Sequence, residues 1–226
     1  MRLFAIFALF VYFFGLLHAQ DIRHISCRFL CFGCGKAPPA IISVSDKGAD
    51  ISCPISENML SHEVVCNAQA DTIAFISSAD RKPAAVAKVS PTMNHVILIF
   101  VPGEKTPNAL PWRVLVIEDS AKNFPDGGLF VANFFNNDIR MRIGDHTGLL
   151  HAGGQYGFPM PGGRNAFNMA PIVFQFQQNG QWRTASESML RFLKGMRYLV
   201  FAYVDPASGR PRISTIQDNV QPSLVK

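Results

Sequence analysis

Charged residues are scarce in this sequence, and no stretch of it is rich in lysine or arginine. Asp, Glu, Lys and Arg make up 16% of the 226 residues, and the formal net charge is +5. This mild excess is spread along the chain without a recognition helix, which argues against nucleic acid as a partner. Hydrophobic residues make up 48%, so the chain can bury a core and intrinsic disorder is excluded.

Alternating strand and helix patterns are also missing, which argues against doubly wound and barrel α/β folds. The apolar runs are short and typical of strands. In residues 138–145, Ile139, Met141 and Ile143 alternate with two arginines and a glycine, which gives one core face and one wet face. The run 95–102, HVILIFVP, is continuously apolar, as expected for a strand buried on both faces. The sequence therefore predicts an all-β, antiparallel β-sandwich architecture.

Turn residues divide these runs. Asn179-Gly180 lies between two strand patterns and predicts a type I′ hairpin. Asn136-Asn137 predicts a second tight hairpin, and residues 205–211 predict the loop of a third. The segment 187–194 fits a helix or a strand end, and the pattern leaves this choice open.

The segment 103–111, GEKTPNALP, has the composition of a linker, with one glycine, two prolines and little apolar content. It divides the chain into a signal peptide at 1–19, an N-terminal β-sandwich domain at 20–102, the linker, and a C-terminal β-sandwich domain at 112–226. Two tandem immunoglobulin-like or related sandwich domains are the first prediction, and one larger sandwich is the alternative.

The N-terminal segment indicates export. Arg2 precedes an uncharged run from Leu3 to Leu17, and Ala19 offers a small residue for cleavage before Gln20. The run is short for a membrane span, which needs about 20 apolar residues. An uncleaved anchor is the alternative, and it is the only membrane association that we predict. The protein is expected in the periplasm, in the cell envelope or outside the cell.

No catalytic motif accompanies this architecture. The chain contains neither a G-x-S-x-G elbow nor an H-E-x-x-H zinc motif. His146 and His151 are five residues apart, which places them on opposite faces of a regular strand. We therefore nominate no catalytic residue, no metal ligand and no cofactor.

The five cysteines carry the most specific chemical pattern. Cys27, Cys31 and Cys34 have the C-x3-C-x2-C spacing of the radical SAM iron–sulfur motif, but glycine stands where that family carries an aromatic residue before the third cysteine. A dithiol redox role at Cys31 and Cys34 would need a helix start to lower a thiol pKa, and the two prolines that follow do not favour one.

Alternation favours a simpler interpretation of the same cysteines. A strand would place four residues on one core face: Ile25, Cys27, Phe29 and Cys31. Buried cysteines then act as small hydrophobic residues. Export permits disulfides, and the candidate pairs are Cys53 with Cys66, or Cys34 with either of them. An odd number of cysteines leaves at least one thiol without an intramolecular partner.

The most unusual loop is 151–165, HAGGQYGFPMPGGRN. Its five glycines and two prolines surround aromatic side chains. Sandwich loops often carry recognition, and exposed aromatic rings can stack on sugar or peptide. We name Tyr156, Phe158 and Arg164 as candidate binding residues, with a glycan or an envelope protein as the partner.

The segments 112–145 and 198–218, WRVLVIEDSAKNFPDGGLFVANFFNNDIRMRIGD and YLVFAYVDPASGRPRISTIQD, resemble parts of uncharacterised exported bacterial β-sandwich proteins. The resemblance implies no activity. Together these observations favour a non-catalytic, exported binding or structural protein of the cell envelope. An extracytoplasmic hydrolase with a loop-borne site is the alternative, and a thiol or metal role for the N-terminal cysteines is the third hypothesis.

Overall fold

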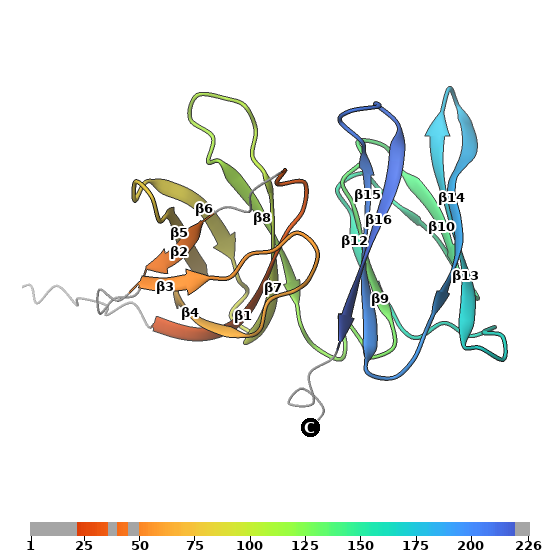
Figure 1. The fold of residues 1–226 in the computed structure, drawn as a ribbon, viewed down its shortest axis with the longest axis horizontal. Helices are drawn as coiled ribbons and strands as arrows, with labels where there is room; N and C mark the ends of the chain where they lie inside the picture. Colours follow the sequence, from red (N-terminus) through yellow and green to blue (C-terminus); the bar gives the residue numbers. More distant parts are fainter. Residues whose placement is uncertain (1–21, 36–39, 45–49, 220–226) are drawn as a thin grey trace, which may run out of the picture.

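The structure is a computed structural model that describes residues 22–35, 40–44 and 50–219. These residues form sixteen strands in three sheets and no helix (Figure 1). The prediction of an all-β, sandwich-like fold is confirmed. The predicted signal peptide lies outside the described residues. Within them, no helix is long and apolar enough to cross a membrane.

The first sheet contains eight strands and curls around its own apolar interior (Figure 1). Its order is β3-β2-β5-β4-β1-β7-β8, and β6 pairs with β5 while also lying beside β8. Its strands are β1 (Ile22–Cys31), β2 (Ile41–Val44), β3 (Asp50–Cys53), β4 (Val64–Gln69), β5 (Thr72–Ser77), β6 (Pro83–Lys88), β7 (His95–Pro102) and β8 (Trp112–Glu118).

The remaining strands form two four-stranded sheets that face each other as a sandwich. One has the order β12-β9-β15-β16 and the other the order β11-β10-β13-β14. Their strands are β9 (Leu129–Asn133), β10 (Ile139–Ile143), β11 (His146–Leu150), β12 (Gln155–Phe158), β13 (Met169–Gln178), β14 (Gln181–Arg191), β15 (Met196–Val204) and β16 (Pro211–Asn219).

The sheet with β9 and β15 lies between the other two and is covered on both faces (Figure 1). Val131 and Val200 point into the sandwich, whereas Phe130 and Phe201 point toward the first sheet. Strand β7 (His95–Pro102) divides its side chains between two cores in the same way, so the prediction for 95–102 is confirmed. Both parallel pairs, β1–β7 and β9–β15, occupy these two-sided positions, where parallel strands are usually found.

The proposed linker is wrong. Residues 103–111 form the loop of a hairpin, since β7 and β8 pair antiparallel from Pro102–Trp112 to Val96–Glu118. The Gly103 amide donates a hydrogen bond to the Pro111 carbonyl at 2.8 Å and closes the loop. Glycine and proline suit a hairpin loop as well as a linker, and apolar content alone could not separate the two. The first sheet therefore extends to Glu118, and the immunoglobulin-like type of the sheets stays a prediction.

The turn predictions have mixed outcomes. Asn179 and Gly180 have φ angles of 51° and 75° and join β13 to β14, as predicted. The loop before Pro211 joins β15 to β16, also as predicted. The segment 187–194 continues β14 to Arg191 and is strand there.

The hairpin expected at Asn136-Asn137 is wrong, because β9 and β10 belong to different sheets. The buried Asn133 side chain redirects the chain between them. Its amide nitrogen donates to the carbonyls of Asn137, Leu150 and His151 at 2.9–3.2 Å.

Candidate functional site

A hollow of about 650 Å³ lies where the edge strands β11 and β12 meet, at the side of the C-terminal sandwich. We call it the Tyr156 hollow. It is lined by Met141, Asp145, His146, Thr147, Gly148, Leu149, Leu150, Tyr156, Phe158 and Pro159. Both edge strands leave side chains open to solvent here: Tyr156 is 58% exposed and Leu149 is 48% exposed. Two of the three predicted binding residues thus line one hollow.

The aromatic residues of the hollow have a fixed arrangement. Phe158 is buried and provides the floor, and the Tyr156 ring stands edge-on to it with 4.8 Å between centroids. The His146 ring lies 5.9 Å from Phe158. An exposed ring that is held by a buried one loses little conformational entropy when a ligand covers it.

Polar groups stand beside these rings. Asp145 Oδ1 accepts a hydrogen bond from the Gly162 amide at 2.7 Å, which ties the Gly-rich loop to the hollow. His146 Nε2 lies 3.9 Å from the same carboxylate oxygen and is buried without a hydrogen-bond partner among the described residues. Burial of a ring nitrogen without a hydrogen-bond partner is costly.

Arg164, the third predicted binding residue, does not line the hollow. Its Nη1 atom is buried and has no hydrogen-bond partner among the described residues. The end of the loop is instead organised by Asn165, whose side-chain oxygen accepts the amides of Phe167 and Met169 at 2.9 and 3.1 Å.

Gly157, between the two aromatic residues of β12, has no room for a side chain. A Cβ atom there would overlap the backbone oxygen of Asn123. We expect Gly157→Ala to displace β12 and to lower the unfolding free energy by about 1–3 kcal/mol in urea titrations. Gly148→Ala on β11 is the matched control, because its nearest atom is Met141 Cε at 4.0 Å. Equal losses for both variants would contradict this packing.

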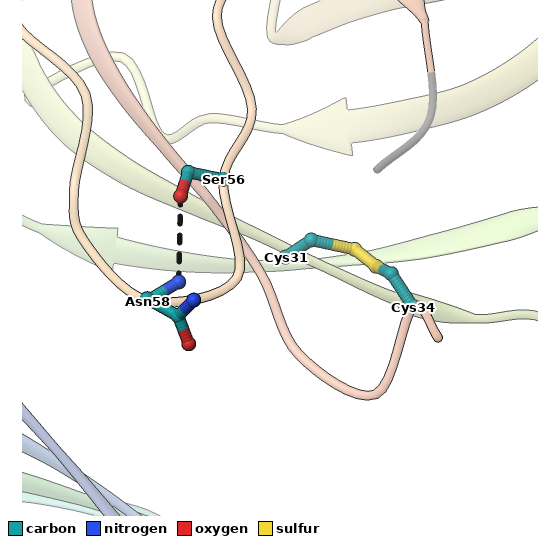
Figure 2. The surroundings of a disulfide bond; sticks show 4 residues. All are labelled: Cys31, Cys34, Ser56 and Asn58. Atoms are coloured by element: carbon teal, nitrogen blue, oxygen red, sulfur yellow. Dashed lines mark hydrogen bonds between the residues drawn. A yellow bond between two sulfur atoms is a disulfide. The ribbon is translucent and has the colours of Figure 1, made fainter. Parts of the chain in front are cut away.

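Figure 2 shows the disulfide that closes the first strand: Cys34 bonds to Cys31, with 6.0 Å between their Cα atoms. The expected pairing of Cys34 with Cys53 or Cys66 is therefore wrong, and Cys53 and Cys66 are not bonded to each other either. Gly33 has a φ of +72°, which turns the chain back immediately after β1. The sequence predicted a strand up to Cys31 but no turn immediately after it.

The other three cysteines, Cys27, Cys53 and Cys66, are free, buried and gathered in the core of the first sheet. The Cys27 thiol donates to the Ile25 carbonyl at 3.5 Å, and the Cys53 thiol donates to the Ile51 carbonyl at 3.7 Å. Interaction with Cys66 and burial raise the pKa of the Cys27 and Cys53 thiols, whereas interaction with these two thiols lowers the pKa of Cys66. Ile25, Cys27, Phe29 and Cys31 share the core face, as predicted.

A ring of four buried charges, which we call the charge ring, joins the first sheet to the second. Its members are Arg28 on β1, Asp119 just after β8, Arg197 on β15 and Asp218 on β16. Asp218 accepts hydrogen bonds from both arginines, and Arg197 also donates to Asp119 at 2.7 Å. The four side chains are only 2–5% exposed. Burial lowers the pKa of Arg28, but the hydrogen bond and charge of Asp218 outweigh it and raise that pKa.

Sequence reasoning missed the charge ring, although one signal was present. Arg197 interrupts the otherwise apolar strand β15, and Arg28 lies between Cys27 and Phe29 in the apolar second half of β1. An arginine in such a position needs a buried carboxylate partner. Its partner could not be named, because Arg28 and Asp218 are 190 residues apart.

Among the described residues, no group of three or more His, Cys, Asp or Glu side chains is arranged to hold a metal ion. Comparison with models of known protein families and with curated proteins finds no match for this chain. The functional argument therefore rests on the geometry of the sites themselves.

Proposed function

We propose that the protein is an exported, non-catalytic binding protein of the cell envelope and that the Tyr156 hollow takes a carbohydrate. The observation that carries the proposal is the Tyr156 ring, 58% exposed and held against the buried Phe158 at the rim of the hollow. The volume of the hollow, about 650 Å³, is within the range of small-molecule sites.

The chemistry of the lining suits a sugar ring. The exposed face of Tyr156 can cover the apolar C–H face of a pyranose, and Leu149 extends this apolar surface. Asp145, His146 and Thr147 offer a carboxylate, an imidazole and a hydroxyl to the hydroxyl groups at the sugar edge. A lining that mixes apolar area with a few polar groups is the usual composition of such sites.

Two features support export. The N-terminal segment is basic and then apolar. Cys31 and Cys34 form a disulfide, and disulfides persist in oxidising compartments. The immunoglobulin-like type of the C-terminal sandwich belongs to the same proposal.

The test is a glycan array followed by calorimetry on the best ligand. Tyr156→Ala is expected to weaken binding about tenfold, since an aromatic contact contributes about 0.5–1.5 kcal/mol beyond the area it buries. Phe167→Ala is the matched control, because Phe167 is 70% exposed and does not line the hollow. Affinity that is equal in both variants, or binding only to an envelope protein, would refute a carbohydrate site at the hollow.

The hydrolase alternative rests on Asp145 and His146, an acid and an imidazole at the same hollow. Mass spectrometry of the glycans after prolonged incubation separates the two functions. Intact glycans support a binding protein, and cleaved glycans assign the hollow to a hydrolase.

A further inference from the structure

A second hollow, of about 560 Å³, lies on the outer face of the sheet β11-β10-β13-β14, next to the Tyr156 hollow. We call it the sheet groove. Four residues line both hollows: Met141, Thr147, Gly148 and Leu149. The two hollows therefore adjoin at the edge strand β11. The outer face of this sheet is turned away from the first sheet (Figure 1), so a ligand in the Tyr156 hollow can extend over β11 into the groove.

Two arginines stand on the floor of the sheet groove. Arg140 and Arg142 on β10 are exposed, whereas Met141 between them is buried. Residues that pair across two strands have their side chains on the same face. Arg140 pairs with Leu149 of β11 and Arg142 pairs with Thr147, so both arginines stand directly beside the strand that the hollows share. A ligand that crosses β11 meets these two positive charges first.

Both charges are free to bind a ligand. Among the described residues, neither arginine forms a salt bridge with a carboxylate. The remaining charged residue of the lining is Glu187 on β14, which follows Arg142 and Val173 in one row of paired residues. Two strand spacings of about 4.8 Å separate β10 from β14, so Glu187 is about 10 Å away. The side of the groove next to β11 is therefore positive.

The Arg140 side chain is also held in place. Its guanidinium carbon lies 4.2 Å from the centroid of the Trp182 ring, which comes from β14. Stacking on an aromatic ring leaves the N–H groups at the edge of a guanidinium free to donate hydrogen bonds. The planar fork of these donors matches the two oxygens of a carboxylate. Because the side chain is already ordered, it loses less entropy when it binds.

We propose that the Tyr156 hollow and the sheet groove form one continuous site for an acidic oligosaccharide, in which Arg140 and Arg142 bind the carboxylate of the sugar beyond the hollow. This rests on the carbohydrate binding proposed for the hollow and narrows it to one class of carbohydrate. Asp145 in the hollow repels a second carboxylate, so the acidic group belongs on the β10 side of β11 and an uncharged sugar belongs in the hollow.

The first test compares acids with their own esters. The probes are oligosaccharides of two to six sugars in which glucuronic or galacturonic acid alternates with a neutral sugar, each printed on an array beside its methyl ester. Calorimetry on the best pair is expected to show about tenfold tighter binding of the acid at low salt, since hydrogen bonds to a charged group are the stronger ones. The difference should shrink as salt is added, because exposed charges are screened.

The second test locates the acidic group. Arg142→Ala and Arg140→Ala should each reduce the preference for the acid severalfold and leave the affinity for the ester nearly unchanged. Arg183→Ala is the matched control. Arg183 is an exposed arginine of the same sheet, but it pairs with the core residue Phe176, so it lies on the opposite face and does not line the groove. Tyr156→Ala should weaken the binding of acid and ester alike.

The outcomes separate this proposal from the one on which it rests. Equal affinities for acids and esters, both lowered by Tyr156→Ala, would overturn the acidic class and leave carbohydrate binding at the hollow intact. Acid binding that depends on Arg142 but not on Tyr156 would overturn the continuous site. A protein that binds none of the glycans would refute carbohydrate binding at the hollow and the acidic class together.

Discussion

Asp218→Ala is expected to lower the free energy of unfolding by about 3–5 kcal/mol, because it removes the carboxylate shared by two buried arginines. The carboxylate of Asp119, 3.7 Å from Arg28, would then be the remaining salt-bridge partner of both Arg28 and Arg197. One positive charge would remain uncompensated at the junction of the first sheet and the C-terminal sandwich, where water cannot reach it.

Urea titration followed by tryptophan fluorescence measures this loss. Asp218→Asn keeps the shape of the side chain and one acceptor oxygen, so its loss should be smaller and it gives a value even if the alanine variant does not fold. Asp50→Ala is the matched control. Asp50 pairs with Arg81 on the surface, where this salt bridge contributes little, and its removal should leave the midpoint nearly unchanged. Similar midpoints for Asp218→Ala and Asp50→Ala would show that the charge ring is not important for stability.

The local structure could largely be predicted from the sequence, because side-chain alternation reports which face of a strand is buried. Ile139, Met141 and Ile143 are buried, and the arginines between them are exposed, as the pattern indicated. The Asn179-Gly180 hairpin could also be predicted, because few residue types tolerate the positive φ angles of its turn.

Strand partners could not be predicted in the same way, because periodicity says nothing about which strands pair. Residues 112–118 read correctly as a strand, yet β8 belongs to the first sheet and not to a second domain. Residues 129–133 pair with β12 and β15, not with the next strand along the chain. These pairings depend on the shared apolar layer, which forms only when segments far apart in sequence meet.

The candidate sites could likewise be predicted only where they depend on local sequence. An unusual loop composition indicated Tyr156 and Phe158, but the hollow they line also needs His146 and Leu149 from β11, which carried no signal of their own. The Cys31–Cys34 disulfide depends on the turn at Gly33, which the alternation of strand residues does not report.

The second large effect is expected for Phe201→Ala. Phe201 is fully buried in the apolar layer between the first and second sheets, together with Leu30, Ile97 and Ile99 from the first sheet. Its truncation leaves a cavity that neither sheet can fill by itself, and we expect a loss of about 3–5 kcal/mol of unfolding free energy. Phe167→Ala removes an exposed ring and should change stability by less than about 0.5 kcal/mol.

The two tryptophans make this substitution a test of how the molecule is built. Trp112 lies on β8 in the first sheet and Trp182 on β14 in the outermost sheet. The Trp182→Phe variant keeps Trp112 and therefore reports the first sheet, and the Trp112→Phe variant keeps Trp182 and reports the C-terminal sandwich. We call these the two parts of the molecule. Because Phe201 belongs to a layer that both parts share, Phe201→Ala should shift both unfolding transitions together. A shift confined to the Trp182 signal would mean that the parts fold independently, as a linker at 103–111 would have required.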